Sequence, residues 1–431
     1  MRTLGDNMKL KKDDRRRFLK RGAAMAGVAL GALRPARAQR SSGMSPDSIS
    51  PGKHLPYGVR SRFEATQRDY SKGGGQYRMS GSAGTPLQDL HGIITPSPLH
   101  FVISHGATPP DFDPKEHRLL IQGMVDRPLI FTLEELKRLP SISRICFLEC
   151  GANSSYRLSS GRYHNGTGPR TPMETHGRTS CSEWSGVLLS LLLREAGMQN
   201  GARWLIGEGA EGGWTISIPL EKSAEVMVVY GQNGEAIRPE QGYPLRLVCP
   251  GFPGDHSVKW LRRVLVSDQP HMSDRDEGQS TVRADGRNRF FKPEMPPKSV
   301  ITYPSGAHRL SGPGFYEITG VAWSGKGVVS RLEISTDGGR TYQDARLQNP
   351  VLPKAHTRFC LDWTWDGRET VLQSRCTDET GEVQPTIDEM AKVWGATKEE
   401  WKENFRTPSL FNPIQPWRVN RDGSIVNALF S

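Results

Sequence analysis

The chain of 431 residues carries a net charge of +11 and contains 46 glycines and 31 prolines. Its length suffices for two or three domains, and its glycine and proline content argues against a simple helical bundle. Residues 1–38 hold eleven Lys/Arg and three Asp, a net of +8, so the rest of the chain carries only +3. This balance argues against nucleic acid as a partner.

Residues 1–38 have the layout of an export signal. The basic stretch RRRFLK at 15–20 is followed by a weakly apolar segment and by an A-x-A pattern at 36–38. RRRFLK resembles the twin-arginine signal, which exports folded proteins, often with a cofactor inside. We therefore expect a twin-arginine signal peptide and a periplasmic mature protein; a merely basic, disordered N-terminus is the alternative. The longest strongly apolar run, at 187–193, is too short for a membrane span.

Residues 39–95 are rich in Ser, Gly and Pro and predict an extended N-terminal arm. Residues 96–270 predict an α+β domain. A strand is expected at 117–123 and a short helix at 132–136, with a capping box of Thr132 and Glu135. An amphipathic helix is expected at 184–196, before Gly197. Further strands are expected at 204–206, 215–218, 226–230, 245–248 and 258–261, with a hairpin turn at Asn233-Gly234.

The polar segment 271–297 predicts a linker, and residues 298–431 predict a second domain. Short alternating strands at 316–318, 321–323, 331–335 and 359–363 recur with turn signals between them. That pattern is typical of an immunoglobulin-like β-sandwich. The expected fold class is therefore α+β, followed by a β-sandwich and a C-terminal tail.

Two of the six cysteines lie in the stretch RICFLECGANSS at 144–155, where a small, turn-prone run follows apolar residues. A cysteine at the end of such a strand is either buried packing or a rigidly held thiolate facing a cavity. Zinc is not indicated, because no CxxC or HxxxH partner lies nearby. We assign Cys146 to the core and leave Cys150 open between core packing and metal ligand. No CxxCH motif is present, so no c-type haem is expected in this chain.

FLECGANS, which contains Cys150, resembles the molybdenum-ligating motif of the sulfite oxidase family. The resemblance continues through TSCSEWSGV at 179–187, QGYPLRLVCPG at 241–251 and SVKWL at 257–261. The segment GVAWSGKGVVSRLEISTDGGRTYQDARL at 320–347 is similar to the dimerisation domain of that family. The similarity covers about residues 85–430. Within the family, these motifs are most like the sulfane dehydrogenase branch.

The resemblance implies a molybdenum–molybdopterin cofactor with the Cys150 thiolate as a ligand of the metal. Thiolate is a soft ligand that suits a metal cycling between oxidation states, and cations suit the phosphate of the pterin. The resemblance also implies a homodimer or a heterotetramer. By motif position, the cofactor-binding residues are Phe101, His105, Glu211, Gln241, Arg246, Ser257 and Lys259; Trp184 lines the pocket and Arg358 contacts the substrate anion.

Three positions depart from the family pattern. Ile103 and Ser155 stand where sulfite oxidases place arginines around the substrate, and Ser280 stands where they place a tyrosine. A pocket with so few cations is expected to bind free sulfite poorly. It would accept a less charged sulfur, or one bound to a carrier protein.

The expected function is the molybdenum-dependent oxidation of a sulfane sulfur on a carrier protein, as in thiosulfate oxidation. The oxygen would come from water, and the electrons would pass to a separate cytochrome c. Two alternatives remain open: a sulfite dehydrogenase acting on free sulfite, and a secreted, cofactor-free Ig-like binding protein in which Cys150 is a core residue.

Overall fold

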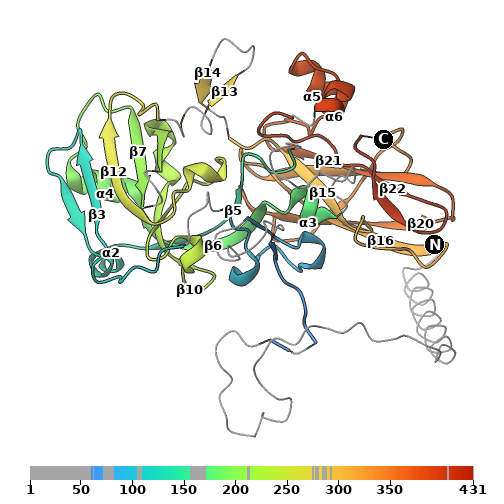
Figure 1. Ribbon diagram of the computed structural model, residues 1–431, viewed down its shortest axis with the longest axis horizontal. Coiled ribbons are helices and arrows are strands. Elements are labelled where there is room, and N and C mark those ends of the chain that lie inside the picture. The colour runs from blue at the N-terminus through green and yellow to red at the C-terminus, as the bar shows by residue number, and fades with distance from the viewer. Residues whose placement is uncertain are drawn as a thin grey trace, which may run out of the picture. The chain divides into compact units, whose positions relative to one another are not determined.

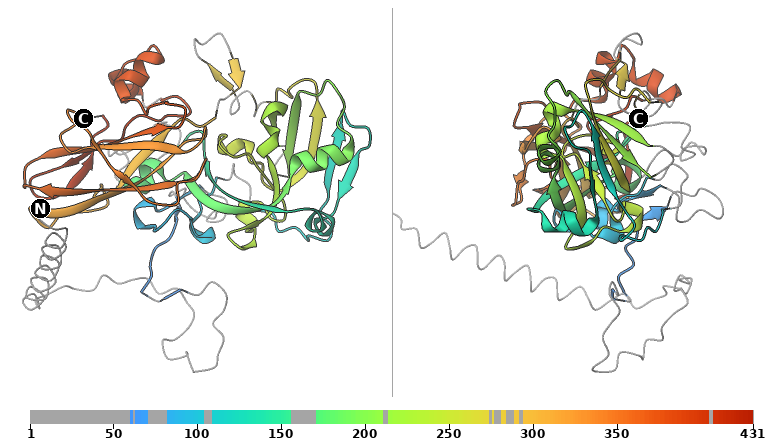
Figure 2. Two further views of the ribbon diagram at one scale, coloured as in Figure 1. Left: turned by 180° about the vertical axis from the view of Figure 1, so that it is seen from behind. Right: turned by 90° about the vertical axis from the view of Figure 1, so that its left-hand side faces the viewer.

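The computed structural model describes residues 60–61, 63–70, 82–103, 109–155, 171–210, 214–273, 276, 281–283, 289–291, 294–404 and 407–430. Residues 65–431 form one compact unit. Figures 1 and 2 show a group of strands with β3, β7 and β12 at one end of this unit and a group with β16, β20 and β22 at the other. Strands β5 and β6 lie between the two groups.

The first domain contains two sheets. One has the order β10-β9-β6-β5, with β11 also paired to β9, and is antiparallel throughout. The other has the order β4-β3-β12-β7-β8, in which only the β12–β3 pair is parallel. The bounds are β3 (Leu119–Gly123), β4 (Leu129–Phe131), β5 (Ile142–Glu149), β6 (Thr179–Leu188), β7 (Trp204–Gly209), β8 (Thr215–Pro219), β9 (Met227–Gln232), β10 (Glu235–Ala236), β11 (Arg246–Val248) and β12 (Leu261–Ser267).

Short helices connect these strands. The expected capping box at the start of α2 is confirmed, since Thr132 and Glu135 exchange hydrogen bonds. Helix α4 ends at Gly197, which adopts the left-handed conformation with φ 70°. The helices of this domain and its N-terminal approach are η1 (Leu87–Asp89), η2 (Ser97–Leu99), α2 (Leu133–Arg138), α3 (Pro172–His176), α4 (Leu189–Ala196), η4 (Leu220–Glu225), η5 (Pro239–Gln241) and η6 (Gly254–His256).

The second domain is a β-sandwich of two antiparallel sheets, as the sequence predicts. Their orders are β15-β16-β20-β19 and β18-β17-β21-β22-β23. The elements are β15 (Lys298–Tyr303), β16 (Gly314–Trp323), β17 (Val329–Ser335), β18 (Gln343–Asp344), β19 (Arg346–Leu347), β20 (Thr357–Trp365), β21 (Thr370–Asp378), α5 (Ile387–Val393), α6 (Lys398–Asn404), β22 (Trp417–Val419) and β23 (Ile425–Asn427).

Two short hairpins lie outside these sheets. Strands β1 (Asp69–Tyr70) and β2 (Ala83–Gly84) belong to the expected N-terminal arm, and β13 (Thr281–Arg283) and β14 (Arg289–Phe291) to the expected linker. The arm is not extended throughout, because it contains the 3-10 helix η1, whose Leu87 is buried in the core of the β-sandwich. No described helix is long and apolar enough to cross a membrane.

Two expected elements differ from the structure. The stretch 184–188, expected as helix, continues strand β6, and only residues 189–196 are helical. Here β6 pairs with β5 on one side and with β9 on the other, and this pairing overrides helical periodicity. The strand expected at 258–261 begins only at Leu261, because Trp260 has a φ of 51° that a strand cannot accommodate. The hairpin turn at Asn233-Gly234 is confirmed.

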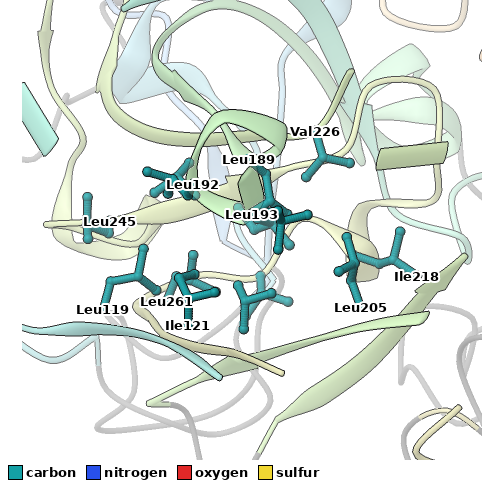
Figure 3. Packing of buried hydrophobic residues seen from close by; sticks show 14 of the residues in the cluster. Leu119, Ile121, Leu189, Leu192, Leu193, Leu205, Ile218, Val226, Leu245 and Leu261 are labelled. Atoms are coloured by element: carbon teal, nitrogen blue, oxygen red, sulfur yellow. The ribbon is translucent and has the colours of Figure 1, made fainter. Parts of the chain in front are cut away.

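The first domain has a core of buried aliphatic side chains between its sheets and α4. Figure 3 shows Leu119 and Ile121 of β3 near Leu261 of β12, with three leucines of α4 above them. Each fully buried leucine or isoleucine contributes roughly 1.5–3 kcal/mol through the hydrophobic effect. This core fixes the two sheets relative to each other, and thereby the loops that lead from them to the site.

Strand β5 separates two further cores by the alternation of its side chains. Cys146 and Leu148 face a cluster with Trp184 and Met227 of the first domain. Phe147, between them, belongs to the core of the β-sandwich. Because successive strand residues point to opposite sides, one eight-residue strand is packed against both domains.

Buried histidines at this junction generate a prediction on acid stability. His100 and His356 are buried, and the loss of hydration lowers the pKa of each to about 3. Unfolding restores a pKa near 6.5, so the unfolded chain binds more protons and stability is lost as the pH falls from about 6.5. At pH 5 the cost is about 2 kcal/mol per histidine. His356 accepts or donates a hydrogen bond with Thr179 Oγ1 at 3.0 Å, which a glutamine can replace.

We expect His356→Gln to flatten the decline in melting temperature between pH 7.5 and pH 5, measured by thermal unfolding at both pH values. An exposed histidine such as His91 serves as the control position. Equal pH dependence in wild type and His356→Gln would contradict the prediction.

Candidate functional site

Cys150 follows the last residue of β5, where the chain turns. Its N–H donates to the Arg178 carbonyl at 3.0 Å, and its own carbonyl accepts from the Asn153 N–H at 2.7 Å. Ser154 completes the turn with a positive φ of 63°. Cys150 is the one cysteine of the six that is half-buried; the other five are buried. The turn therefore presents the Cys150 thiol at the surface of a pocket.

Arg246, on β11, stands on the same pocket. Its guanidinium donates to the Gln241 carbonyl at 3.1 Å, to Gln241 Oε1 at 2.9 Å and to the Ser257 carbonyl at 3.2 Å. Gln241 in turn donates to the Phe101 carbonyl at 2.8 Å. These bonds fix the orientation of the guanidinium, and through Gln241 they link it to Phe101, 140 positions away in the sequence.

Lys259 is positioned by an unusual backbone conformation in its neighbour. Trp260 is fully buried with φ 51°, and its indole N–H donates to the Pro239 carbonyl at 2.9 Å. Lys259 Nζ lies 4.2 Å from the centre of that indole ring and donates to the Ile103 carbonyl at 3.0 Å. Gly242 allows the backbone to approach, since a Cβ there would lie 3.0 Å from Lys259 Cα. A bulky residue with positive φ often marks a functional site.

The pocket has a cationic wall. Burial lowers the pKa of Arg246 to about 9, which is still above neutral pH, so the guanidinium is charged there. Among the described residues it pairs with no carboxylate, and its hydrogen-bond partners there are all neutral oxygens. It lies 5.3 Å from the ring centre of Trp184. A buried cation without an anion is costly, and an anionic ligand would relieve that cost.

The structure brings most of the predicted site residues together. The pocket is lined by Phe101, Val102, Ile103, Cys150, Gly151, Trp214, Glu240, Gln241, Arg246, Gly254, Asp255, Ser257, Val258 and Lys259. Six of these, Phe101, Cys150, Gln241, Arg246, Ser257 and Lys259, are residues to which the sequence analysis gave a role in the site. His105 and Glu211 lie outside the described residues.

Trp184 and Arg358 are placed differently. Trp184 is fully buried behind Arg246, and its indole nitrogen has no hydrogen-bond partner in the described part of the chain. Arg358, on β20, does not line this pocket; it donates to the Leu90 and Gly92 carbonyls at 2.8 and 2.7 Å. Its contact with a substrate therefore stays a prediction.

Of the three positions that depart from the family pattern, two are described. Ile103 lines the pocket with a half-buried side chain. Ser155 donates its hydroxyl proton to the Ala152 carbonyl at 2.8 Å and so folds back on its own turn. Ser280 lies outside the described residues. Neither described position adds a cation to the pocket.

Sequence reasoning missed a buried ion pair next to Cys150. Glu149 and Lys298 form a fully buried ion pair, with Nζ and Oε1 2.5 Å apart. The available signal was a charged residue beside an apolar pair in each of two strands, Glu149 after Phe147-Leu148 and Lys298 shortly before Val300-Ile301. Charged residues are almost never fully buried unless they are paired.

The described residues fit a molybdopterin cofactor. A half-buried thiol offers a soft metal ligand, and Arg246, Lys259 and the Ser257 hydroxyl offer donors for a phosphate and a pterin. The indole nitrogen of Trp184, close to Arg246, is a buried donor without a partner among those residues.

Family models match both domains. Residues 105–274 match the oxidoreductase molybdopterin binding domain, and residues 289–406 match the Mo-co oxidoreductase dimerisation domain. The matched ranges contain the pocket residues from Cys150 to Lys259 and the β-sandwich from β15 to β21; β22 and β23 lie beyond them.

Solved and curated proteins resemble the chain over most of its length. The crystal structure of the sulfane dehydrogenase SoxCD from Paracoccus pantotrophus has 36% sequence identity and a TM-score of 0.78, over 89% of this chain and 97% of that one. Nitrate reductase [NADH] 1 from Phaseolus vulgaris is 33% identical over 66% of this chain and 35% of its own length. The corresponding Arabidopsis thaliana protein is 32% identical over 68% and 34%. The chain thus spans about a third of the nitrate reductases that it matches.

Cys150 and Cys146 provide a matched test of the metal ligand. Both lie on the same side of β5, but only Cys150 reaches the pocket. We expect the protein to contain molybdenum, and Cys150→Ser to abolish the visible absorption band that arises from the bond between the cysteine thiolate and the metal. Cys146→Ser buries a hydroxyl and destabilises the fold by about 1–3 kcal/mol, but it leaves that absorption unchanged. Metal analysis and absorption spectroscopy check both; an unchanged spectrum in Cys150→Ser would refute the assignment.

Proposed function

Because the chain belongs to the sulfite oxidase family of molybdenum oxidoreductases, we propose that it oxidises a sulfane sulfur held on a carrier protein. The observation that carries this proposal is the pocket itself. A half-buried Cys150 thiol shares it with Arg246 and Lys259, whereas Ile103 occupies the position of a substrate-binding arginine. The similarity to a sulfane dehydrogenase structure supports the same assignment.

The residues of this chain have separate roles in the proposed reaction. Cys150 would hold the metal, and Arg246, Lys259, Ser257 and Gln241 would hold the pterin and its phosphate. When bound, the cofactor supplies two-electron redox chemistry and the transfer to sulfur of an oxygen atom that originates in water. Arg246 needs no reorganisation to meet an anion, because its hydrogen bonds to neutral carbonyls already fix its direction.

The proposed substrate class follows from the absence of cations at Ile103 and Ser155, the two described positions where the family places substrate-binding arginines. A sulfite dianion needs several cations for its recognition, as the family's arginines provide. Ile103 offers a hydrocarbon surface, and the Ser155 hydroxyl is engaged with Ala152. A neutral or singly charged sulfur chain on a carrier would lose less hydration on entering such a pocket.

The remaining parts of the proposal concern location and partners. The RRRFLK motif supports export of the folded protein to the periplasm. Electrons would pass to a cytochrome c on a separate chain, since this chain contains no haem-attachment motif. The match of the β-sandwich to a dimerisation domain supports a homodimer or a heterotetramer with that cytochrome.

The donor assay tests the proposal. We expect a persulfide on a carrier protein to reduce the enzyme, followed by electron transfer to cytochrome c, at a rate on the order of a hundredfold above that with millimolar free sulfite. Stopped-flow absorption of the cytochrome gives both rates, and the free carrier without persulfide serves as the blank. Equal rates with both donors would favour the sulfite dehydrogenase alternative and refute the sulfane proposal.

Ile103 is the position at which the two donors are discriminated. Ile103→Arg introduces a guanidinium into the pocket, so we expect the KM for sulfite to fall on the order of tenfold, as a charge-assisted pair in a partly buried site provides. Ile103→Leu keeps the hydrocarbon and the volume and is the matched control. Steady-state kinetics of both variants check the prediction. An unchanged KM for sulfite in Ile103→Arg would show that this position does not select the donor.

A further inference from the structure

The β-sandwich contacts the end of β5 at every second residue. The Phe147 N–H donates to the Lys354 carbonyl at 2.9 Å, and the Gly151 carbonyl accepts from the Leu410 N–H at 2.7 Å. Between them, Glu149 reaches Lys298 at the start of β15. Strand β5 is an edge strand of its sheet, so these bonds use positions that its own sheet leaves open.

The Glu149 carboxylate is fully buried and accepts three hydrogen bonds. Lys298 Nζ lies 2.5 Å from Oε1, and Trp323 Nε1 at the end of β16 lies 2.6 Å from Oε2. Asn153 Nδ2 lies 2.9 Å from Oε1. Two donors therefore come from the β-sandwich, whereas the third comes from the turn that follows Cys150.

Asn153 connects the Glu149 carboxylate to the backbone groups on both sides of Cys150. Its side-chain oxygen accepts from the Arg178 N–H at 3.0 Å, and the Arg178 carbonyl accepts from the Cys150 N–H at 3.0 Å. Its backbone N–H donates to the Cys150 carbonyl. Both backbone groups of Cys150 are thus fixed by partners that Asn153 orients, and Asn153 is held by Glu149.

Buried aromatic rings pack around Trp323, which donates to Glu149. The ring centres of His176 and His356 lie 6.4 and 5.3 Å from that of Trp323. Burial and the nearby Lys298 charge hold the pKa of His176 well below its usual value, so it stays neutral. Hydrogen bonds to a charged group in such a dry environment are strong and directional.

We propose that Glu149 is a positioning residue for the metal-binding thiolate: the β-sandwich, through Lys298 and Trp323, sets the orientation of Cys150 in the pocket. The inference rests on the proposed function in one respect, namely that Cys150 is the molybdenum ligand. It gives the second domain a direct part in the site besides the dimerisation after which its family is named.

Two mild variants test the network, because Lys298→Met would leave a buried charge and threaten folding. Trp323→Phe removes one donor to Glu149, and Asn153→Ala removes the link from Glu149 to the turn. The matched control is Trp365→Phe. Trp365 is buried in the same core, and its indole N–H donates at 2.7 Å to the Arg368 carbonyl, in a different turn.

The readouts are taken on the cofactor-loaded enzyme at equal molybdenum content. In Trp323→Phe and Asn153→Ala we expect a shifted sulfur–metal absorption band and a changed electron paramagnetic resonance spectrum of the partly reduced metal. We also expect kcat to fall on the order of tenfold, as small misplacement of a reacting group does, with KM unchanged. Trp365→Phe should lower the melting temperature while both spectra stay those of the wild type.

Cys150→Ser separates failure of this inference from failure of the proposed function. If Cys150→Ser alters the spectra but Trp323→Phe and Asn153→Ala do not, Glu149 only joins the domains and the inference is overturned, while the proposed function stands. If Cys150→Ser itself keeps the wild-type spectra, Cys150 is not the ligand, and both fail. A spectral change in Trp365→Phe equal to that in Trp323→Phe would also overturn the inference.

Discussion

The alternation of side chains along β5 is the constraint on which the site depends. Cys146 and Leu148 pack into the first domain, and Phe147 packs into the β-sandwich. The same period places Glu149 toward the sandwich and Cys150 toward the pocket. A shift of one residue in the register of β5 would exchange these directions, and it is opposed by two hydrophobic cores at once.

Two buried cations at this junction differ in the charge of their partners. Lys298 is paired with Glu149, whose other carboxylate oxygen accepts a hydrogen bond from the Trp323 indole. Arg246, on the other side of β5, bonds only neutral oxygens among the described residues. The Glu149–Lys298 pair suits a fixed structural role, because removing one partner of a buried ion pair is costly. Arg246 suits the binding of an anionic ligand, because no described residue supplies a negative charge to its guanidinium.

Much of this arrangement could be predicted from the sequence. The β-sandwich, the capping box of α2 and the burial of Cys146 follow from local patterns. The helix predicted at 184–188 was wrong, because hydrophobic periodicity contains no information on the pairing of β6 with a strand on each side. The Glu149–Lys298 pair was missed for a similar reason: its partners are 149 positions apart, and no local pattern indicates which distant charge a buried carboxylate meets.

By itself the sequence determined which chemical groups are available: a thiol at a turn, cations in the QGYPLR and SVKW segments, and the hydrocarbon side chain of Ile103. Only the tertiary structure decided which of them meet. Arg358 carries the positive charge that contact with an anionic substrate requires, yet its guanidinium donates hydrogen bonds to the Leu90 and Gly92 carbonyls. Local sequence fixes the direction of a side chain through the period of its strand, whereas its partner depends on how separate strands pack.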